Sequence, residues 1–128
     1  MYYPEKNQAA LLKKLANLSS DDYAIVCFCA EWCKTCAGFK LLFEALAAKY
    51  PQHAFVWVDI EEQEYLLIEE DIEDLPTVLI QNKKGTLYYG PLLPFAEHIE
   101  RLLLQAQNKA QYIEAVADFE QLLIAAAQ

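Results

Sequence analysis

Two apolar runs on either side of an amphipathic segment constrain the fold of this chain more than any other feature. The first run, YAIVCFCA, covers residues 23–30, and the second, HAFVWVDI, covers residues 53–60. Both are continuous and rich in β-branched and aromatic residues, which is typical of strands buried on both faces of a parallel sheet. Residues 36–50 between them predict a helix that ends before Pro51, with one apolar stripe: Phe39, Leu42, Phe43 and Leu46. We therefore expect a strand–helix–strand unit.

The remaining segments predict further helices and one hairpin around this unit. Helices are expected at residues 5–18, 62–71, 94–107 and 109–127, and the turn NKKG joins strands at 77–81 and 86–90. The expected inward-facing residues are Ala9, Leu12, Leu15, Ala16, Phe95, Ile99, Leu102, Leu103, Tyr112, Val116, Phe119 and Leu123. Strands that alternate with helices and close with a hairpin indicate an α/β fold, with a mixed sheet and helices on both faces. We expect residues 1–128 to form one domain.

Charge and length exclude several classes of function. The 128 residues carry a formal net charge of −9, which repels phosphate backbones and anionic lipids, so we expect neither nucleic acid nor a membrane as partner. The first residues lack the pattern of a secretory signal, and the apolar runs are too short to cross a bilayer. We expect a cytoplasmic protein, in whose reducing surroundings a close cysteine pair indicates catalysis or metal binding more often than structure.

All four cysteines lie within ten positions, and two of them form a Cys-x-x-Cys motif where a strand meets a helix. The first turn of a helix stabilises a nearby anion, so it favours the thiolate of Cys33, as does the positive charge of Lys34. Cys36 lies one turn later on the same side, where it can attack a mixed disulfide formed by Cys33. Trp32 is expected to cover one side of the pair.

The segment AEWCKTC at this junction, followed by LPTV at residues 75–78, resembles the thioredoxin family over about residues 5–105. The resemblance implies a thioredoxin-like fold with an extra C-terminal helix at about 109–127. It also implies thiol–disulfide exchange with protein disulfides, with Cys33 and Cys36 as the catalytic residues. No cofactor is implied, and the expected recycling partner is a reductase such as thioredoxin reductase.

The same resemblance implies a substrate groove beside the cysteines. In the family a cis-proline faces the active site, and here the matching residue is Pro76. A cis bond turns the neighbouring peptide groups outward, so Leu75 is expected to pair with an extended substrate segment. Gly90 falls where the family keeps a glycine beside this groove. Together with Trp32, these residues predict an apolar and unselective binding surface.

Five positions depart from the family pattern. Lys34 and Thr35 separate the cysteines where thioredoxins usually have glycine and proline, which predicts a less reducing potential. Cys27 and Trp57 occupy the positions of the family's buried aspartate and its lysine partner, so the usual proton-transfer groups are missing. Leu41 replaces a helix-kinking proline.

The two upstream cysteines allow more than one interpretation. Cys27 is either a small buried hydrophobic residue or a third thiol near Cys36 that exchanges disulfides internally. Cys29 is expected only to pack. A metal site formed by all four cysteines is a weaker hypothesis, because two of them lie within a buried strand. His53 and His98 are interpreted as ordinary surface or strand-edge residues.

Two further alternatives concern the whole chain. A thioredoxin-like domain also serves as a binding or adaptor module with little redox activity, and the missing acid favours that interpretation. The helix at 109–127 has an apolar stripe that packs either on the domain or against a partner. A homodimer through this helix is therefore a hypothesis.

Overall fold

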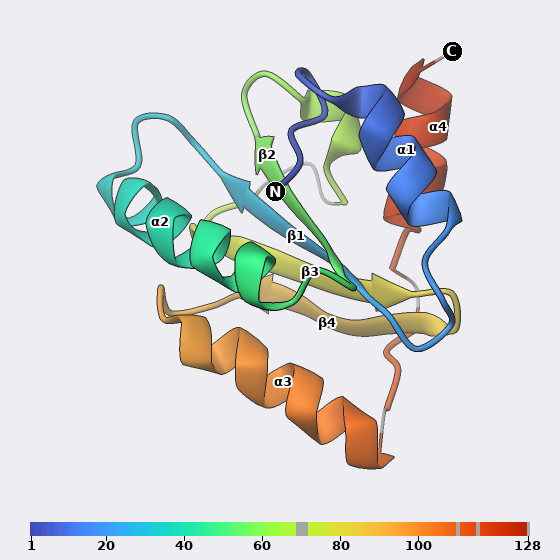
Figure 1. Cartoon of the computed structure of the whole chain (residues 1–128). Helices are drawn as coiled ribbons and strands as arrows, with labels where there is room; N and C mark the ends of the chain where they lie inside the picture. Colours follow the sequence, from blue (N-terminus) through green and yellow to red (C-terminus); the bar gives the residue numbers. More distant parts are fainter. Residues whose placement is uncertain (69–71, 110, 115, 128) are drawn as a thin grey trace.

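The computed structural model describes residues 1–68, 72–109, 111–114 and 116–127 (Figure 1). Its described part contains one four-stranded sheet in the order β2-β1-β3-β4. The strands are β1 (Ala24–Cys29), β2 (Ala54–Asp59), β3 (Thr77–Asn82) and β4 (Gly85–Pro91). Strands β1 and β2 are parallel, whereas β1–β3 and β3–β4 are antiparallel. The expected mixed sheet is confirmed.

Helices cover both faces of this sheet (Figure 1). They are α1 (Gln8–Ala16), α2 (Lys34–Lys49), α3 (Ala96–Lys109) and α4 (Phe119–Ala127), with a short 3₁₀ turn, η1, at Glu64–Leu66. Buried residues of α2 and α3 share one apolar cluster, whereas those of α1, η1 and α4 share the other. No helix within the described ranges is long and apolar enough to span a bilayer.

The two clusters explain why β1 is apolar along its whole length. Side chains alternate between the faces of a strand, so Cys27 and Cys29 face α2 and α3, and Val26 and Phe28 face α1 and α4. All six residues of β1 are buried. A continuous apolar run is therefore required here, because neither face of the strand meets water.

Several residues do not face inward as the periodicity predicted. Ala9, Ala16, Leu42 and Phe95 are exposed, and Leu11 takes the buried position on α1. The helix expected at 62–71 is reduced to η1, and residues 69–71 of that prediction lie outside the described residues.

The predicted C-terminal helix at 109–127 is also wrong in its first half. Helix α4 begins only at Phe119, and Tyr112 and Val116 precede it. The backbone N–H of Ile113 donates to the carbonyl of Thr86 at 2.8 Å, so this part of the chain pairs with the edge strand β4 instead of forming helical hydrogen bonds. Positions 110 and 115 of the predicted helix lie outside the described residues.

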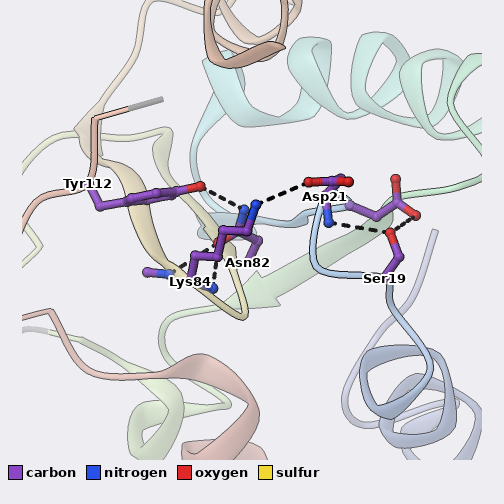
Figure 2. Close-up of polar contacts among 7 residues, drawn as sticks. Ser19, Asp21, Asn82, Lys84 and Tyr112 are labelled. Atoms are coloured by element: carbon purple, nitrogen blue, oxygen red, sulfur yellow. Dashed lines mark hydrogen bonds and ion pairs between the residues drawn. The ribbon is translucent and has the colours of Figure 1, made fainter. Parts of the chain in front are cut away.

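The turn between β3 and β4 connects three parts of the chain (Figure 2). The side-chain oxygen of Asn82 accepts the backbone N–H groups of Lys84 and Gly85 at 2.8 and 3.1 Å, which closes the turn. The Asn82 amide donates to the hydroxyl of Tyr112 at 3.2 Å. Lys84 forms an ion pair at 3.2 Å with Asp21, which lies in the loop between α1 and β1. The turn thereby holds the C-terminal segment against the sheet.

Helix α4 is held by a second polar contact with the sheet. The amide nitrogen of the buried Gln81 donates to the Thr86 hydroxyl at 2.9 Å and to the Ala117 carbonyl at 2.6 Å, and its oxygen accepts the backbone N–H of Phe119 at 2.9 Å. Phe119 and Leu123 are fully buried. The extra helix therefore packs on its own domain, which is one of the two outcomes expected from the sequence.

Candidate active site

Cys33 lies at the start of α2, as the sequence predicted. It is the N-cap residue, with φ −85° and ψ 111°, and its Sγ accepts the backbone N–H of Cys36 at 3.3 Å. Its carbonyl accepts the N–H of Ala37 at 3.1 Å, which starts the helix. The sulfur therefore occupies the place of an N-cap oxygen at the positive end of the helix dipole. Cys33 is half-buried, whereas the other three cysteines are buried.

Cys36 is bonded to Cys29, whereas Cys33 is a free thiol. The Cα atoms of Cys29 and Cys36 are 5.9 Å apart, a usual separation for a disulfide. The expectation that Cys29 only packs is therefore wrong. Cys29 ends β1 with its side chain toward α2, and Cys36 lies in the first turn of α2 above it, which brings the two sulfurs together.

Cys27 is the third sulfur of this cluster. Its Sγ lies 3.6 Å from that of Cys29, and because a bonded Cys29 carries no hydrogen, Cys27 is the donor. Burial, followed by the negative charge of Cys33, raises the pKa of the Cys27 thiol well above its ordinary value. Cys27 is therefore a protonated thiol whose sulfur contacts the Cys29 sulfur of the disulfide.

Leu75 and Pro76, two of the residues predicted to line a substrate groove, lie at the same end of the sheet as the cysteines. The peptide bond between Leu75 and Pro76 is cis, as expected. Strand β3 begins at the next residue, which pairs with Phe28 near the end of β1. Leu75 and Cys33 both pack against the cluster that contains Cys36. These contacts bring the cis-proline segment and the cysteines to one place.

Gly90 also lies at this edge, where it pairs with Val78 of β3. It lines a surface hollow whose rim carries two acidic residues, Glu73 and Asp74. The hollow beside Gly90 is therefore lined in part by acidic side chains.

Trp32 is held by a residue that the sequence analysis missed. Its side chain is 67% exposed, and its indole N–H donates to the carboxylate of Glu61. Glu61 follows β2, and the carboxyl ends of the parallel strands β1 and β2 meet at one edge, so the strand order contained the signal for this contact. Lys34 and Thr35 are exposed in the first turn of α2.

No group of three or more potential metal ligands occurs within the described ranges. The sulfurs of Cys29 and Cys36 are bonded to each other. His53 lies away from the cysteines and accepts the backbone N–H of Tyr23 at 2.9 Å through Nδ1, and His98 packs beside Phe95 on α3.

A comparison with family models decides the wider assignment, because the thioredoxin model matches residues 5–91. The chain belongs to the thioredoxin family. The putative thioredoxin H10 of Arabidopsis thaliana is 40% identical over 55 residues, which are 43% of this chain and 36% of that protein. The putative thioredoxin-4 of Dictyostelium discoideum is 31% identical over 70 residues, 55% of this chain and 67% of that protein. The match thus spans about a third of the Arabidopsis relative.

Solved structures of thioredoxins share the fold. Thioredoxin NaTrxh from Nicotiana alata superposes with a TM-score of 0.65 at 20% identity, covering 80% of this chain and 89% of that structure. Thioredoxin from Fasciola hepatica gives 0.62 at 24% identity, covering 76% and 92%. At these identities the likeness establishes the thioredoxin-like fold alone.

Within this fold, two departures from the family pattern lie side by side. Cys27 and Trp57, which the resemblance assigns to the positions of the family's aspartate and its lysine partner, pair directly across β1 and β2. The Trp57 ring packs on Phe43 with ring centroids 5.8 Å apart, and the Nζ atom of Lys40 lies 5.9 Å from the centroid of the Trp57 ring. A cysteine and an aromatic ring thus pack together behind helix α2.

Proposed function

We propose that this chain is a thiol–disulfide oxidoreductase that exchanges disulfides with protein substrates. The observation that carries the proposal is the position of the half-buried residue Cys33, whose sulfur caps α2 and accepts the N–H of Cys36. The cis peptide before Pro76 lies at the same edge of the sheet. Both features support the roles that the resemblance to thioredoxins implies.

In the proposed reaction, the Cys33 thiolate attacks one sulfur of a substrate disulfide. A mixed disulfide forms, and the other substrate sulfur leaves as a thiolate. The Cys36 thiolate then attacks the Cys33 sulfur, which releases the second substrate thiolate and leaves a Cys33–Cys36 disulfide. Two electrons have passed from the protein dithiol to the substrate, and a dithiol reductase such as thioredoxin reductase returns them.

We place the substrate segment along Trp32, Leu75, Pro76 and Gly90. The backbone of Leu75, turned outward by the cis bond, pairs with an extended chain in the manner of an added strand. Trp32, held by Glu61, borders the other side of Cys33. Lys34 and Thr35 adjust the balance between dithiol and disulfide, and we propose a potential less reducing than that of thioredoxins with glycine and proline at these positions.

The cellular setting follows from the same proposal. Electron transfer to protein disulfides requires a compartment that keeps the dithiol reduced, so we propose a cytoplasmic protein that contributes to cell redox homeostasis. The net charge of −9 argues against nucleic acid and anionic membranes as partners. Phe119 and Leu123 are buried within the chain, and this burial argues against a homodimer through α4.

Insulin reduction with dithiothreitol as electron donor tests the proposed activity. We expect the wild type to accelerate the precipitation of insulin and Cys33→Ser to abolish the acceleration. An equal rate for the two proteins would instead favour an adaptor function. That second candidate is supported by the bond between Cys29 and Cys36, which removes the resolving cysteine from the exchange.

A further inference from the structure

Cys36 has two sulfur neighbours, one on each side. Toward the surface, the Sγ of Cys33 accepts the backbone N–H of Cys36. Toward the core, the Sγ of Cys36 is bonded to Cys29. Cys36 therefore lies between two cysteines, Cys33 and Cys29, and either can be its disulfide partner.

We propose that Cys29 is a second disulfide partner of Cys36, so that a disulfide formed at the surface moves inward during the reaction. The inference rests on the proposed oxidoreductase function, which supplies the first bond, between Cys33 and Cys36. The Cys29 thiolate attacks the Cys36 sulfur, the Cys29–Cys36 bond forms, and the Cys33–Cys36 bond breaks with Cys33 leaving as a thiolate. The proton lost by Cys29 is regained by Cys33 through solvent, so the internal step involves no net oxidation.

Burial makes Cys33 the only route to this inner bond among the four cysteines of the chain. Cys29 and Cys36 are 1% and 2% exposed, and Cys27 is fully buried, whereas Cys33 is half-buried. An external thiol or disulfide therefore meets Cys33 first. Cys27, 3.6 Å from the Cys29 sulfur, donates its hydrogen there and stabilises negative charge on Cys29 when the exchange runs in reverse.

The inner bond changes what the oxidised protein does. A Cys33–Cys36 disulfide leaves no accessible thiol at the site, but a Cys29–Cys36 disulfide leaves Cys33 free. Cys33 then attacks a second disulfide, and the mixed disulfide persists because Cys36 is bonded elsewhere and does not resolve it. The oxidised protein is thus a covalent trap for disulfides, whereas the reduced protein turns them over.

Peptide mapping of the full-length wild type tests the inner bond directly. Glu31 and Lys34 separate the cysteines, so digestion with Glu-C and trypsin puts Cys33 in the fragment 32–34 and Cys36 in 35–40. The protein is oxidised with glutathione disulfide, alkylated with N-ethylmaleimide, digested and analysed by mass spectrometry. We expect fragment 35–40 linked to the fragment that ends at Glu31, and Cys33 alkylated or glutathionylated.

Matched cysteine variants identify the partner. Cys27→Ser should keep the inner link, since Cys27 shares the strand and the face of Cys29 but carries no bond. Cys29→Ser should show only fragments 32–34 and 35–40 linked, with no alkylation at Cys33. The wild type alone can overturn the proposal. It does so if only the link between fragments 32–34 and 35–40 is found at every ratio of reduced to oxidised glutathione.

Cys33→Ser separates this inference from the proposed function. We expect Cys33→Ser to form the inner bond at least tenfold more slowly than the wild type, because the bond passes through Cys33. Equal rates would overturn the inward movement of the disulfide, even in a protein that reduces insulin normally. A wild type that fails to reduce insulin, yet forms the inner bond only with Cys33 present, would overturn the proposed function and support the exchange.

Discussion

The Nδ1 atom of His53 accepts the backbone N–H of Tyr23 at 2.9 Å, so the turn before β2 is fastened to the residue that precedes β1. This hydrogen bond needs the lone pair of a neutral imidazole nitrogen. Burial lowers the pKa of His53, opposed by Asp22 and assisted by Lys14. The folded protein therefore holds His53 in the neutral form.

The free energy of unfolding should consequently decrease as the pH becomes acidic. The unfolded chain binds a proton at His53 near pH 6.5, whereas the folded chain binds it only at lower pH. The contribution of His53 is complete above about pH 6.5 and is lost as the pH falls through the lower pKa of the folded state. Urea unfolding between about pH 7.5 and 5 should show this loss. His53→Gln should weaken the pH dependence, and His98→Gln should leave it intact; equal slopes in all three proteins would contradict the assignment.

Glu61→Ala should release the Trp32 indole. Loss of one hydrogen bond of about 0.5–1.5 kcal/mol predicts a reduction of kcat/KM for insulin of about two- to tenfold, mainly through KM. Glu61→Gln keeps an acceptor oxygen and is the matched control. Fluorescence anisotropy in a Trp57→Phe background reports the mobility of Trp32 separately. Unchanged anisotropy in Glu61→Ala would show that the contact does not hold the ring.

Gln81→Leu should destabilise the fold because it removes three hydrogen bonds at a buried position. Unpaired buried backbone groups cost about 1–3 kcal/mol each, so we expect the free energy of unfolding to fall by at least about 2 kcal/mol. Gln121→Leu, on the exposed side of α4, provides a control of the same chemistry. Chemical denaturation measures both, and similar losses would argue against a specific role for Gln81.

Phe119→Ala should cost about 3–5 kcal/mol, because it opens a cavity under α4 where the side chain is fully buried. The exposed Gln121→Ala serves as the reference.

Light scattering on the wild type should give a monomer, since the face that would form a dimer is occupied within the chain. A concentration-dependent dimer that Phe119→Ala abolishes would instead assign this face to an interface.

Cys27 should resist alkylation in the reduced native protein. Its raised pKa and complete burial leave little accessible thiolate, so iodoacetamide should modify it about a hundredfold more slowly than Cys33 at neutral pH. Mass spectrometry after added chymotrypsin, which cuts after Phe28, distinguishes Cys27 from Cys29. In urea the rates should converge; a fast native reaction at Cys27 would contradict its burial.

The sequence predicted the elements whose signals are local. The continuous apolar runs became β1 and β2 to within one residue at each end, and Cys33 starts α2 as the Cys-x-x-Cys motif indicated. The cis bond before Pro76 also agrees with the prediction from the resemblance. These features depend on hydrophobic pattern, capping and turn chemistry, which neighbouring residues determine.

The wrong and the missed predictions depend on how separate elements are arranged in space. The bond between Cys29 and Cys36 requires the last side chain of β1 to point under the first turn of α2, which spacing alone does not decide. Ile113 leaves a helical pattern because the free edge of β4 offers it a backbone partner. Glu61 meets Trp32 only once β2 lies parallel to β1. Tertiary pairing overrode local preference in each case.

The docking of α4 has a consequence for the order in which the protein is made. Leu11, Leu15 and Leu66 share their apolar cluster with Phe119 and Leu123, so this face of the sheet is only partly covered until residues 119–127 have been synthesised. The opposite face is covered earlier by α2 and α3. On the ribosome, the half of the domain that holds the cysteines can mature while the other half still exposes apolar surface, and chaperones that bind such surface should engage the α1 side last.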